Sequence, residues 1–269
     1  MPRVSKRSRL YRTDSVVLRR QDLGEADRIV TIFTPGYGKL RAVAKGVRKP
    51  GSRKAGHLEP LARSNLLLAK GRELDIITQA ETIDAYPTLR QDLDRLGQAA
   101  YVVELVDRFG VEESESQALF HLTTNTLERL DQDNETAAPL RYFQVRLLDL
   151  SGYRPELHRC VNCSDEAQPQ DQFFSADEGG LLCPNCGPKN LYARPLSLGA
   201  LKVLRHYQRH GYEEAARPQI SGSVALEVEA LMESYLNHLV ERELHVPTFV
   251  RQVREVRQAG YDSPRSDLS

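Results

Sequence analysis

Four cysteines are the residues whose spacing points most directly to chemistry. They form two Cys-x2-Cys pairs, Cys160/Cys163 and Cys183/Cys186, and 19 residues lie between the pairs. This spacing allows four thiolates to meet tetrahedrally at about 2.3 Å from one Zn²⁺. Because four protein ligands leave no open coordination position, the pattern predicts one structural zinc ion per chain and not a catalytic one. Four free thiols and a redox dithiol are the alternatives.

The segment between the cysteine pairs has the pattern of a short hairpin. Phe173-Phe174 and Leu181-Leu182 are two apolar pieces around Gly179-Gly180. Such a hairpin is too small to have a core of its own, so a metal ion must stabilise it. Helical patterns precede and follow the segment, which predicts a zinc-binding insert at about residues 157–192. His158 lies close to the first pair, but we expect it near the site or at the surface and not as a ligand.

A second group of candidate residues is basic. Seven cations and no acidic residue occur between positions 39 and 54: Lys39, Arg41, Lys45, Arg48, Lys49, Arg53 and Lys54. The first three alternate along a predicted strand and would share one face, and the others lie on a Gly/Pro loop that could follow a phosphate backbone. Tyr37, in a Pro-Gly-Tyr-Gly turn, is a candidate for stacking on a base, whereas Phe33 on a strand is favoured as a core residue.

The charge distribution supports a polyanion-binding first domain. The whole chain is neutral, with 37 Lys and Arg against 37 Asp and Glu. Residues 1–80 carry 18 basic against 7 acidic residues, whereas residues 81–269 carry 19 against 30. An excess that spans a whole domain and contrasts with its neighbour indicates binding of a polyanion such as nucleic acid. The alternative is that these charges only keep the domain soluble.

No catalytic motif is complete. Gly51 and Gly56 have the spacing of a phosphate-binding loop, but His57-Leu58 follows where Lys-Ser/Thr is required. His206 and His210 share one helix face without the Glu of a metalloprotease motif, so we expect surface or core histidines there. The chain is therefore predicted not to be an enzyme, although residues distant in sequence can still form a triad.

The first 80 residues predict a small β-barrel. Five short aliphatic or β-branched runs are separated by Gly and Pro turns, at residues 16–18, 29–33, 40–44, 66–68 and 74–78. Five strands in about 80 residues favour an OB-like barrel over a sandwich. An SH3-like barrel of similar length remains open.

After residue 86 the apolar residues recur every three or four positions, which predicts helices. Three helices are expected around residues 93–109, 119–130 and 140–147, and two more at 197–209 and 223–244, with Ser197 and Ser223 as N-caps. The predicted fold is multidomain: an OB-like barrel (1–82) and an all-α domain (83–256) with the zinc-finger-like insert. Residues 257–269 are expected to be a disordered tail.

The sequence gives no indication of a membrane or of secretion. No apolar run approaches the roughly 18 residues of a membrane span, and the basic first residues lack the apolar stretch of a signal peptide. We therefore expect a cytoplasmic protein. In a reducing compartment, metal binding accounts for four cysteines better than disulfides do.

Several short motifs, in this order, resemble the RecO family of bacterial recombination mediators. They are Gly24–Thr34 (GEADRIVTIFT), Gly38–Arg48 (GKLRAVAKGVR), Leu58–Pro60 (LEP), Ser151–Pro155 (SGYRP), and Cys160–Cys186 followed by Pro195–Ser197 (PLS). The resemblance spans about residues 10–245. It implies an OB domain and a helical domain with a zinc-binding insert, and Lys39, Arg41, Lys45 and Arg48 match the family's DNA-binding face. Because some family members lack the cysteines, zinc would serve fold stability.

The resemblance also implies partners. A member of this family would bind single- and double-stranded DNA, anneal complementary strands and act with RecR, and often RecF, to help RecA displace single-strand-binding protein. The helical domain would bind the acidic tail of single-strand-binding protein, and Arg141 and Arg146, which flank Phe143, are the basic residues we expect to receive it. Two rivals remain: an RNA- or ribosome-associated OB protein with a zinc ribbon, and an adaptor that binds no nucleic acid.

Overall fold

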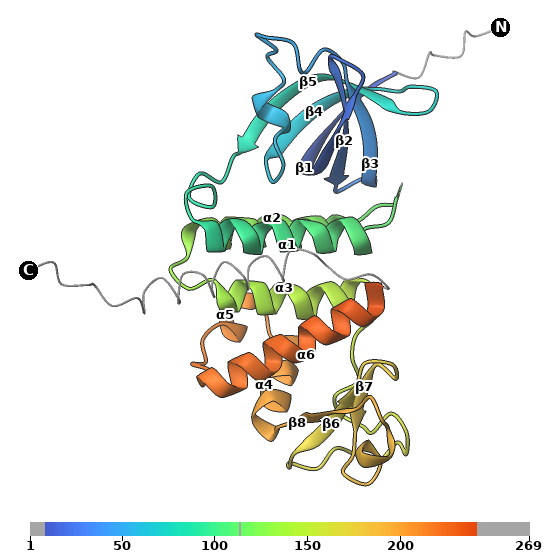
Figure 1. Ribbon diagram of the computed structural model, residues 1–269, viewed down its shortest axis with the longest axis vertical. Coiled ribbons are helices and arrows are strands. Elements are labelled where there is room, and N and C mark those ends of the chain that lie inside the picture. Colours follow the sequence, from blue (N-terminus) through green and yellow to red (C-terminus); the bar gives the residue numbers. More distant parts are fainter. Residues whose placement is uncertain (1–8, 113, 241–269) are drawn as a thin grey trace, which may run out of the picture. The chain divides into compact units, whose positions relative to one another are not determined.

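The computed structural model describes residues 9–112 and 114–240 (Figure 1). Its described residues group into two compact units, with the division between Asp133 and Asn134. The first unit contains five strands and two helices, and the second contains four helices and a three-stranded sheet. A five-stranded domain followed by helices is therefore confirmed. In the described residues, no helix is both long and apolar enough to cross a membrane.

The five strands of the first unit form a closed barrel. They are β1 (Leu10–Leu23), β2 (Asp27–Thr34), β3 (Gly38–Ala44), β4 (Arg63–Ala69) and β5 (Asp75–Asp84). The strand order is β1-β2-β3-β5-β4, and β1 closes the barrel because it pairs with both β2 and β4. All neighbours are antiparallel except β3 and β5. All five predicted strands are confirmed.

Alternation along the strands fills the barrel with small and branched aliphatic side chains. The buried core contains Val17, Val30, Ile32, Ala42, Ala44, Leu66, Leu68 and Ile77. In β2, Val30 and Ile32 belong to this core, so Thr31 and Phe33 point to the outer side of the sheet. Yet Phe33 is 0% exposed. Something therefore covers the outer face of β2, and it is the first helix pair.

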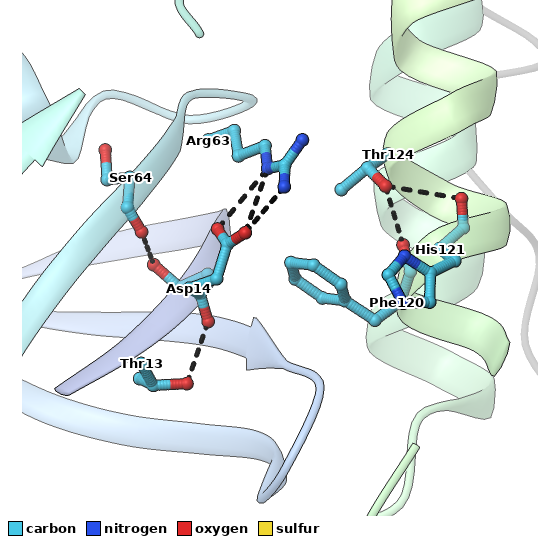
Figure 2. Close-up of polar contacts among 8 residues, drawn as sticks. Thr13, Asp14, Arg63, Ser64, Phe120, His121 and Thr124 are labelled. Carbon is cyan, nitrogen blue, oxygen red and sulfur yellow. Dashed lines mark hydrogen bonds and ion pairs between the residues drawn. The ribbon is translucent and has the colours of Figure 1, made fainter. Parts of the chain in front are cut away.

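This helix pair packs on the barrel through aromatic and charged side chains. It comprises α1 (Leu93–Phe109) and α2 (Gln117–Gln132). The ring of Phe33 lies 6.3 Å from that of Phe120 on α2. Figure 2 shows Arg63 of β4, which is ion-paired with Asp14 and also close to the same Phe120 ring; its guanidinium carbon lies 5.9 Å from the ring centroid. The rings of Phe33 and Phe120 and the guanidinium of Arg63 thus join the barrel to this helix pair.

The turn between β2 and β3 is also tied to the chain that joins α1 and α2. Lys39 N–H donates to Val111 O at 3.0 Å, and Ser116 N–H donates to Pro35 O at 2.9 Å. Gly38 has φ +60°, and a Cβ added there would lie 2.4 Å from the carbonyl oxygens of Val111 and Ser114. Only glycine fits this close approach of two backbones.

In the second unit, one helix precedes the cysteine segment and three helices follow it. Its elements are α3 (Ala137–Leu150), β6 (Gln172–Ser175), β7 (Gly180–Leu182), β8 (Arg194–Leu196), α4 (Leu198–Arg209), α5 (Tyr212–Ala215) and α6 (Gly222–Val240). The hairpin predicted between the cysteine pairs is β6–β7. Strand β8 was not predicted, and it pairs with the other edge of β6. The insert therefore extends past residue 192 to Leu196.

Two helix starts were predicted from serine N-caps, with different outcomes. Ser197 does cap α4, because its Oγ accepts from Ala200 N–H at 3.1 Å. The prediction for Ser223 is wrong, because α6 begins at Gly222 and places that serine inside its first turn. The end predicted for this helix at residue 244 and the tail predicted at 257–269 lie outside the described residues.

The predicted boundary between residues 82 and 83 follows the change from strands to helices. The compact units divide the chain about 50 residues later, because α1 and α2 group with the barrel. A change of hydrophobic period marks where helices begin, but it does not show which surface they cover.

Candidate nucleic-acid interface and metal centre

The four cysteines come together as a site that can hold a metal ion. The Sγ atoms of Cys160, Cys163, Cys183 and Cys186 all lie within 4.8 Å of one another. The Sγ atoms of Cys163 and Cys183 are 3.7 Å apart. Four sulfurs placed tetrahedrally at about 2.3 Å from a central ion lie about 3.8 Å apart, and a disulfide would require about 2 Å. The arrangement fits a tetrahedral thiolate centre, and no disulfide joins any of the four.

Backbone N–H groups prepare this site for thiolates. Burial opposes ionisation of Cys160, but the N–H groups of Cys163, Cys183 and Asn162 point at its sulfur and lower its pKa to about 7. Cys183 N–H, for example, donates to Cys160 Sγ at 3.3 Å. Hydrogen bonds to the charged form stabilise it, and a metal ion requires that form. The local backbone therefore favours the thiolate form of Cys160, which is the form that binds a metal ion.

Each cysteine pair is a tight turn fixed by its own hydrogen bonds. Ser164 N–H donates to Cys160 O at 2.8 Å, and Cys186 and Gly187 both donate to Cys183 O. Behind the second turn, a Cβ on Gly187 would lie 2.2 Å from Cγ of Phe173. A side chain is excluded there because the Phe173 ring packs directly on the turn, and this ring joins the cysteines to β6.

The histidines singled out in the sequence lie outside the cysteine cluster. The pKa of His158 is lowered, first by burial and then by the nearby Arg205 and Arg209 guanidinium groups. His210 Nδ1 lies 2.6 Å from Glu214 Oε2, and His206 Nε2 lies 3.0 Å from Glu214 O. The cysteine cluster is the one metal-ligand group found in residues 9–112 and 114–240.

Two of the seven predicted DNA-binding cations are engaged inside the first unit. Lys39 Nζ donates to Asp107 O at 2.7 Å and lies 3.6 Å from Asp107 Oδ1, and its side chain is 16% exposed. Lys54 Nζ donates to Lys45 O and Ile77 O, both at 3.0 Å. Burial lowers the pKa of Lys54. The side chain of Lys39 therefore links β3 to α1, and that of Lys54 links the loop after β3 (residues 45–54) to the barrel.

Four of the cations are exposed and have no partner among the described residues. The side chains of Arg41, Lys45, Lys49 and Arg53 make no hydrogen bond or ion pair with the part of the chain that is described. Arg48 is intermediate, because it is exposed but donates to Gly24 O at 3.0 Å and lies 3.3 Å from Asp22 Oδ2. The expectation of one exposed face along β3 thus fails at Lys39, which α1 covers, whereas Arg41 faces solvent.

Tyr37 lies in a cluster that the sequence did not predict. Tyr37 is 37% exposed, and its ring centroid lies 4.8 Å from that of Tyr11. Lys70 Nζ lies 4.8 Å from the Tyr11 centroid and 5.7 Å from the Tyr37 centroid. Asp75 anchors both, because its Oδ2 accepts from Tyr11 OH at 2.5 Å and pairs with Lys70 at 3.1 Å. An exposed aromatic beside a cation is the combination that single-stranded nucleic acid needs.

The two arginines predicted to receive an acidic peptide are partly engaged. Arg146 Nη1 pairs with Asp149 Oδ2 at 2.8 Å on the same helix. The side chain of Arg141 is hydrogen-bonded to that of Tyr207. Its Nε is buried without a hydrogen-bond partner in the described chain. Phe143 between them is 0% exposed. A peptide at this helix would therefore have to displace existing contacts, and the assignment stays a prediction.

Comparison with known proteins relates both halves of the chain to one protein family. Family models match "Recombination protein O N terminal" at residues 8–86 and "Recombination protein O C terminal" at residues 90–247. A protein called DNA repair protein RecO from Roseiflexus sp. is 42% identical over 93% of this chain and 88% of its own. Proteins of the same name are 36% identical in Dehalococcoides mccartyi, over 87% of this chain and 92% of theirs, and 35% identical in Desulforamulus reducens, over 90% and 94%. The chain belongs to the Recombination protein O family.

Proposed function

We propose that this protein acts in recombinational DNA repair by binding and annealing DNA strands. Together with RecR it would help RecA load on single-stranded DNA that single-strand-binding protein covers. Family membership supports the role in repair, since the relatives are named for it. The DNA-binding part of the proposal depends on the surface of the barrel.

The four unpartnered cations are the observation that carries this proposal. Arg41, Lys45, Lys49 and Arg53 are all exposed. Surface cations are usually neutralised in part by neighbouring acids, and here no acidic residue occurs from position 39 to 54. The loop that carries three of them is not free to collapse, because Lys54 holds its far end on the barrel. Exposed cations on β3 and the loop that follows it, without partners in the described residues, suit contact with a polyphosphate backbone.

The cluster of Tyr37, Tyr11 and Lys70 would supply a second kind of contact on the same barrel. An unpaired base can stack on the exposed face of Tyr37, while Lys70 contributes a cation beside both rings. Stacking favours unpaired strands, because bases in a duplex already stack on one another. Sequence-independent binding of this kind suits annealing, where any pair of complementary strands has to be accepted.

Zinc would complete the cysteine centre. Four thiolates prefer Zn²⁺ among the common divalent ions, and a fully occupied tetrahedral site serves structure. Its effect would be to stabilise β6–β8, where one small buried cluster contains Cys160 and Cys186 together with Leu182. The proposed partners are the acidic tail of single-strand-binding protein, RecR and often RecF, and family membership is their only support.

The test is a salt-dependent titration with a labelled thymidine homopolymer, run beside the RNA equivalent. Binding is expected to be nearly independent of sequence, and log K should fall linearly with log salt. Tyr37→Ala should weaken binding to single strands by about 1 kcal/mol with the salt slope unchanged. No binding at low salt would refute the proposal, and equal or tighter binding of RNA would favour an RNA-associated protein.

A further inference from the structure

One turn of the cysteine-containing insert (residues 157–196, here called the cysteine module) presents two large apolar side chains to solvent. Leu191 is 93% exposed and Tyr192 is 75% exposed. No other large apolar side chain in residues 9–112 and 114–240 is as exposed as either of them. Single exposed apolar residues are ordinary, but two adjacent ones at the tip of a short turn form a small contact surface.

The turn is held in shape by Asn190. The side chain of Asn190 donates to Glu178 Oε1 at 2.7 Å and accepts from Tyr192 N–H at 3.0 Å. Its backbone N–H donates to Gly187 O at 3.0 Å, and its carbonyl accepts from Ala193 N–H at 3.2 Å. These hydrogen bonds from one residue fix the direction of the turn. Leu191 and Tyr192 are thus held outward, and the cysteine turn at Gly187 supports them.

Two cations flank this turn and have no partner in residues 9–112 and 114–240. Lys189 precedes it and Arg194 follows it at the start of β8; both are exposed. Neither side chain forms an ion pair or hydrogen bond with any described residue. The carboxylate of Glu178 is engaged with Asn190 at the base of the turn. Exposed aromatic surface between two free cations matches the chemistry of an unpaired nucleic-acid strand, in which bases alternate with phosphates.

We propose that residues 189–194 are a second contact for single-stranded nucleic acid, in which Tyr192 stacks on a base and Lys189 and Arg194 receive phosphates. This rests on the proposed function, because it assumes that the chain handles unpaired DNA. It goes beyond that function by giving the cysteine module a task other than stability. A protein with one contact on each compact unit can hold two strands at once, and annealing requires two.

The absence of tryptophan from the chain makes a direct test possible. Tyr192→Trp places a single indole fluorophore at the turn, and Tyr37→Trp places one on the barrel as the matched reporter. A long thymidine homopolymer should quench both, because a base stacked on an indole quenches its emission. Quenching of the barrel reporter alone overturns the second contact and leaves the proposed function intact. If neither reporter responds and the wild-type protein does not bind, the proposed function itself fails.

Further variants separate base stacking on Tyr192 from hydrogen bonding by its hydroxyl and from a purely electrostatic contact. Tyr192→Ala should weaken strand binding about fivefold, and Tyr192→Phe should not. Lys189→Ala with Arg194→Ala should flatten the salt slope of the Tyr192→Trp reporter by about 1.4, whereas the exposed pair Lys202→Ala with Arg217→Ala should leave it unchanged. Emission that shifts with protein concentration in the absence of DNA would indicate a contact between copies of the chain and would overturn the proposal. A response to an acidic peptide without a response to the homopolymer would do the same.

Discussion

Replacing the four unpartnered cations by alanine should change the salt dependence of DNA binding by a calculable amount. Each phosphate contact to a single strand contributes about 0.7 to the slope of log K against log salt, so loss of Arg41, Lys45, Lys49 and Arg53 should flatten it by about 3. If the lines converge near 1 M salt, affinity at about 0.1 M should fall by a factor on the order of 10³. The exposure of all four side chains predicts that folding is unaffected.

Lys39→Ala is the informative comparison, because Lys39 carries the same charge as Arg41 and lies on the same strand. Its ammonium is already bound to Asp107 and is mostly covered. The substitution should cost about 1 to 2 kcal/mol of unfolding free energy, since a charged hydrogen bond between β3 and α1 is lost. It should leave the salt slope within error of the wild type.

The assay is fluorescence anisotropy of a labelled thymidine homopolymer over a series of salt concentrations, with urea unfolding of each variant in parallel. Two results would refute the reasoning. Superimposable lines for the wild type and the quadruple variant would show that the exposed cations do not contact DNA. A slope reduced by Lys39→Ala as much as by Arg41→Ala alone would show that Lys39 leaves Asp107 to bind phosphate.

Three other substitutions test the metal site and the attachment of the first helix pair. Cys183→Ser should reduce zinc below one equivalent and lower the melting temperature while sparing the barrel's DNA contacts; protein purified without zinc under reducing conditions would contradict this. Gly38→Ala should cost at least about 2 kcal/mol by urea unfolding, because its Cβ would meet two carbonyl oxygens at 2.4 Å. Gly36→Ala, with open space around it, should cost much less. Arg63→Ala should lower the free energy of unfolding by about 1 to 2 kcal/mol, because its contacts with Asp14 and the Phe120 ring are removed. A decrease no larger than that caused by Arg12→Ala, at an exposed arginine, would disprove that role.

The strands were predictable because each apolar run is bounded by Gly or Pro, but their lengths were not. β1 was recognised from Val16 and Leu18, yet it runs from Leu10 to Leu23. Both of its ends are largely exposed, so they carry no apolar alternation. β5 continues from Thr78 to Asp84 through polar residues such as Glu81 for the same reason. Hydrophobic patterns record burial, and strand ends beyond the core leave little trace in them.

The metal centre was predictable residue by residue, whereas the binding surface was only partly so. Cysteine pairs are local, and their spacing alone determines that four sulfurs can meet. The surface depends on contacts between segments that are distant in sequence. Lys39 is covered because it bonds to Asp107, which is 68 residues away, and the ring of Tyr37 lies against that of Tyr11. Lys70 was missed because an isolated lysine in a basic domain carries no signal of its own. Its distance in sequence from Tyr11 and Tyr37 follows no motif, so the spacing of these residues did not reveal the cluster either.

The cover over Phe33 has a consequence for how the protein is made. The last barrel strand ends at Asp84, but α2, which supplies Phe120, ends only at Gln132. At a synthesis rate of about 5 to 20 residues per second, roughly 2 to 10 s separate the two on the ribosome. During that interval the nascent barrel carries an uncovered aromatic side chain on β2. The uncovered ring of Phe33 is then a binding site for a chaperone that shields apolar surface. A stop codon placed after residue 84 would leave this ring without its cover permanently.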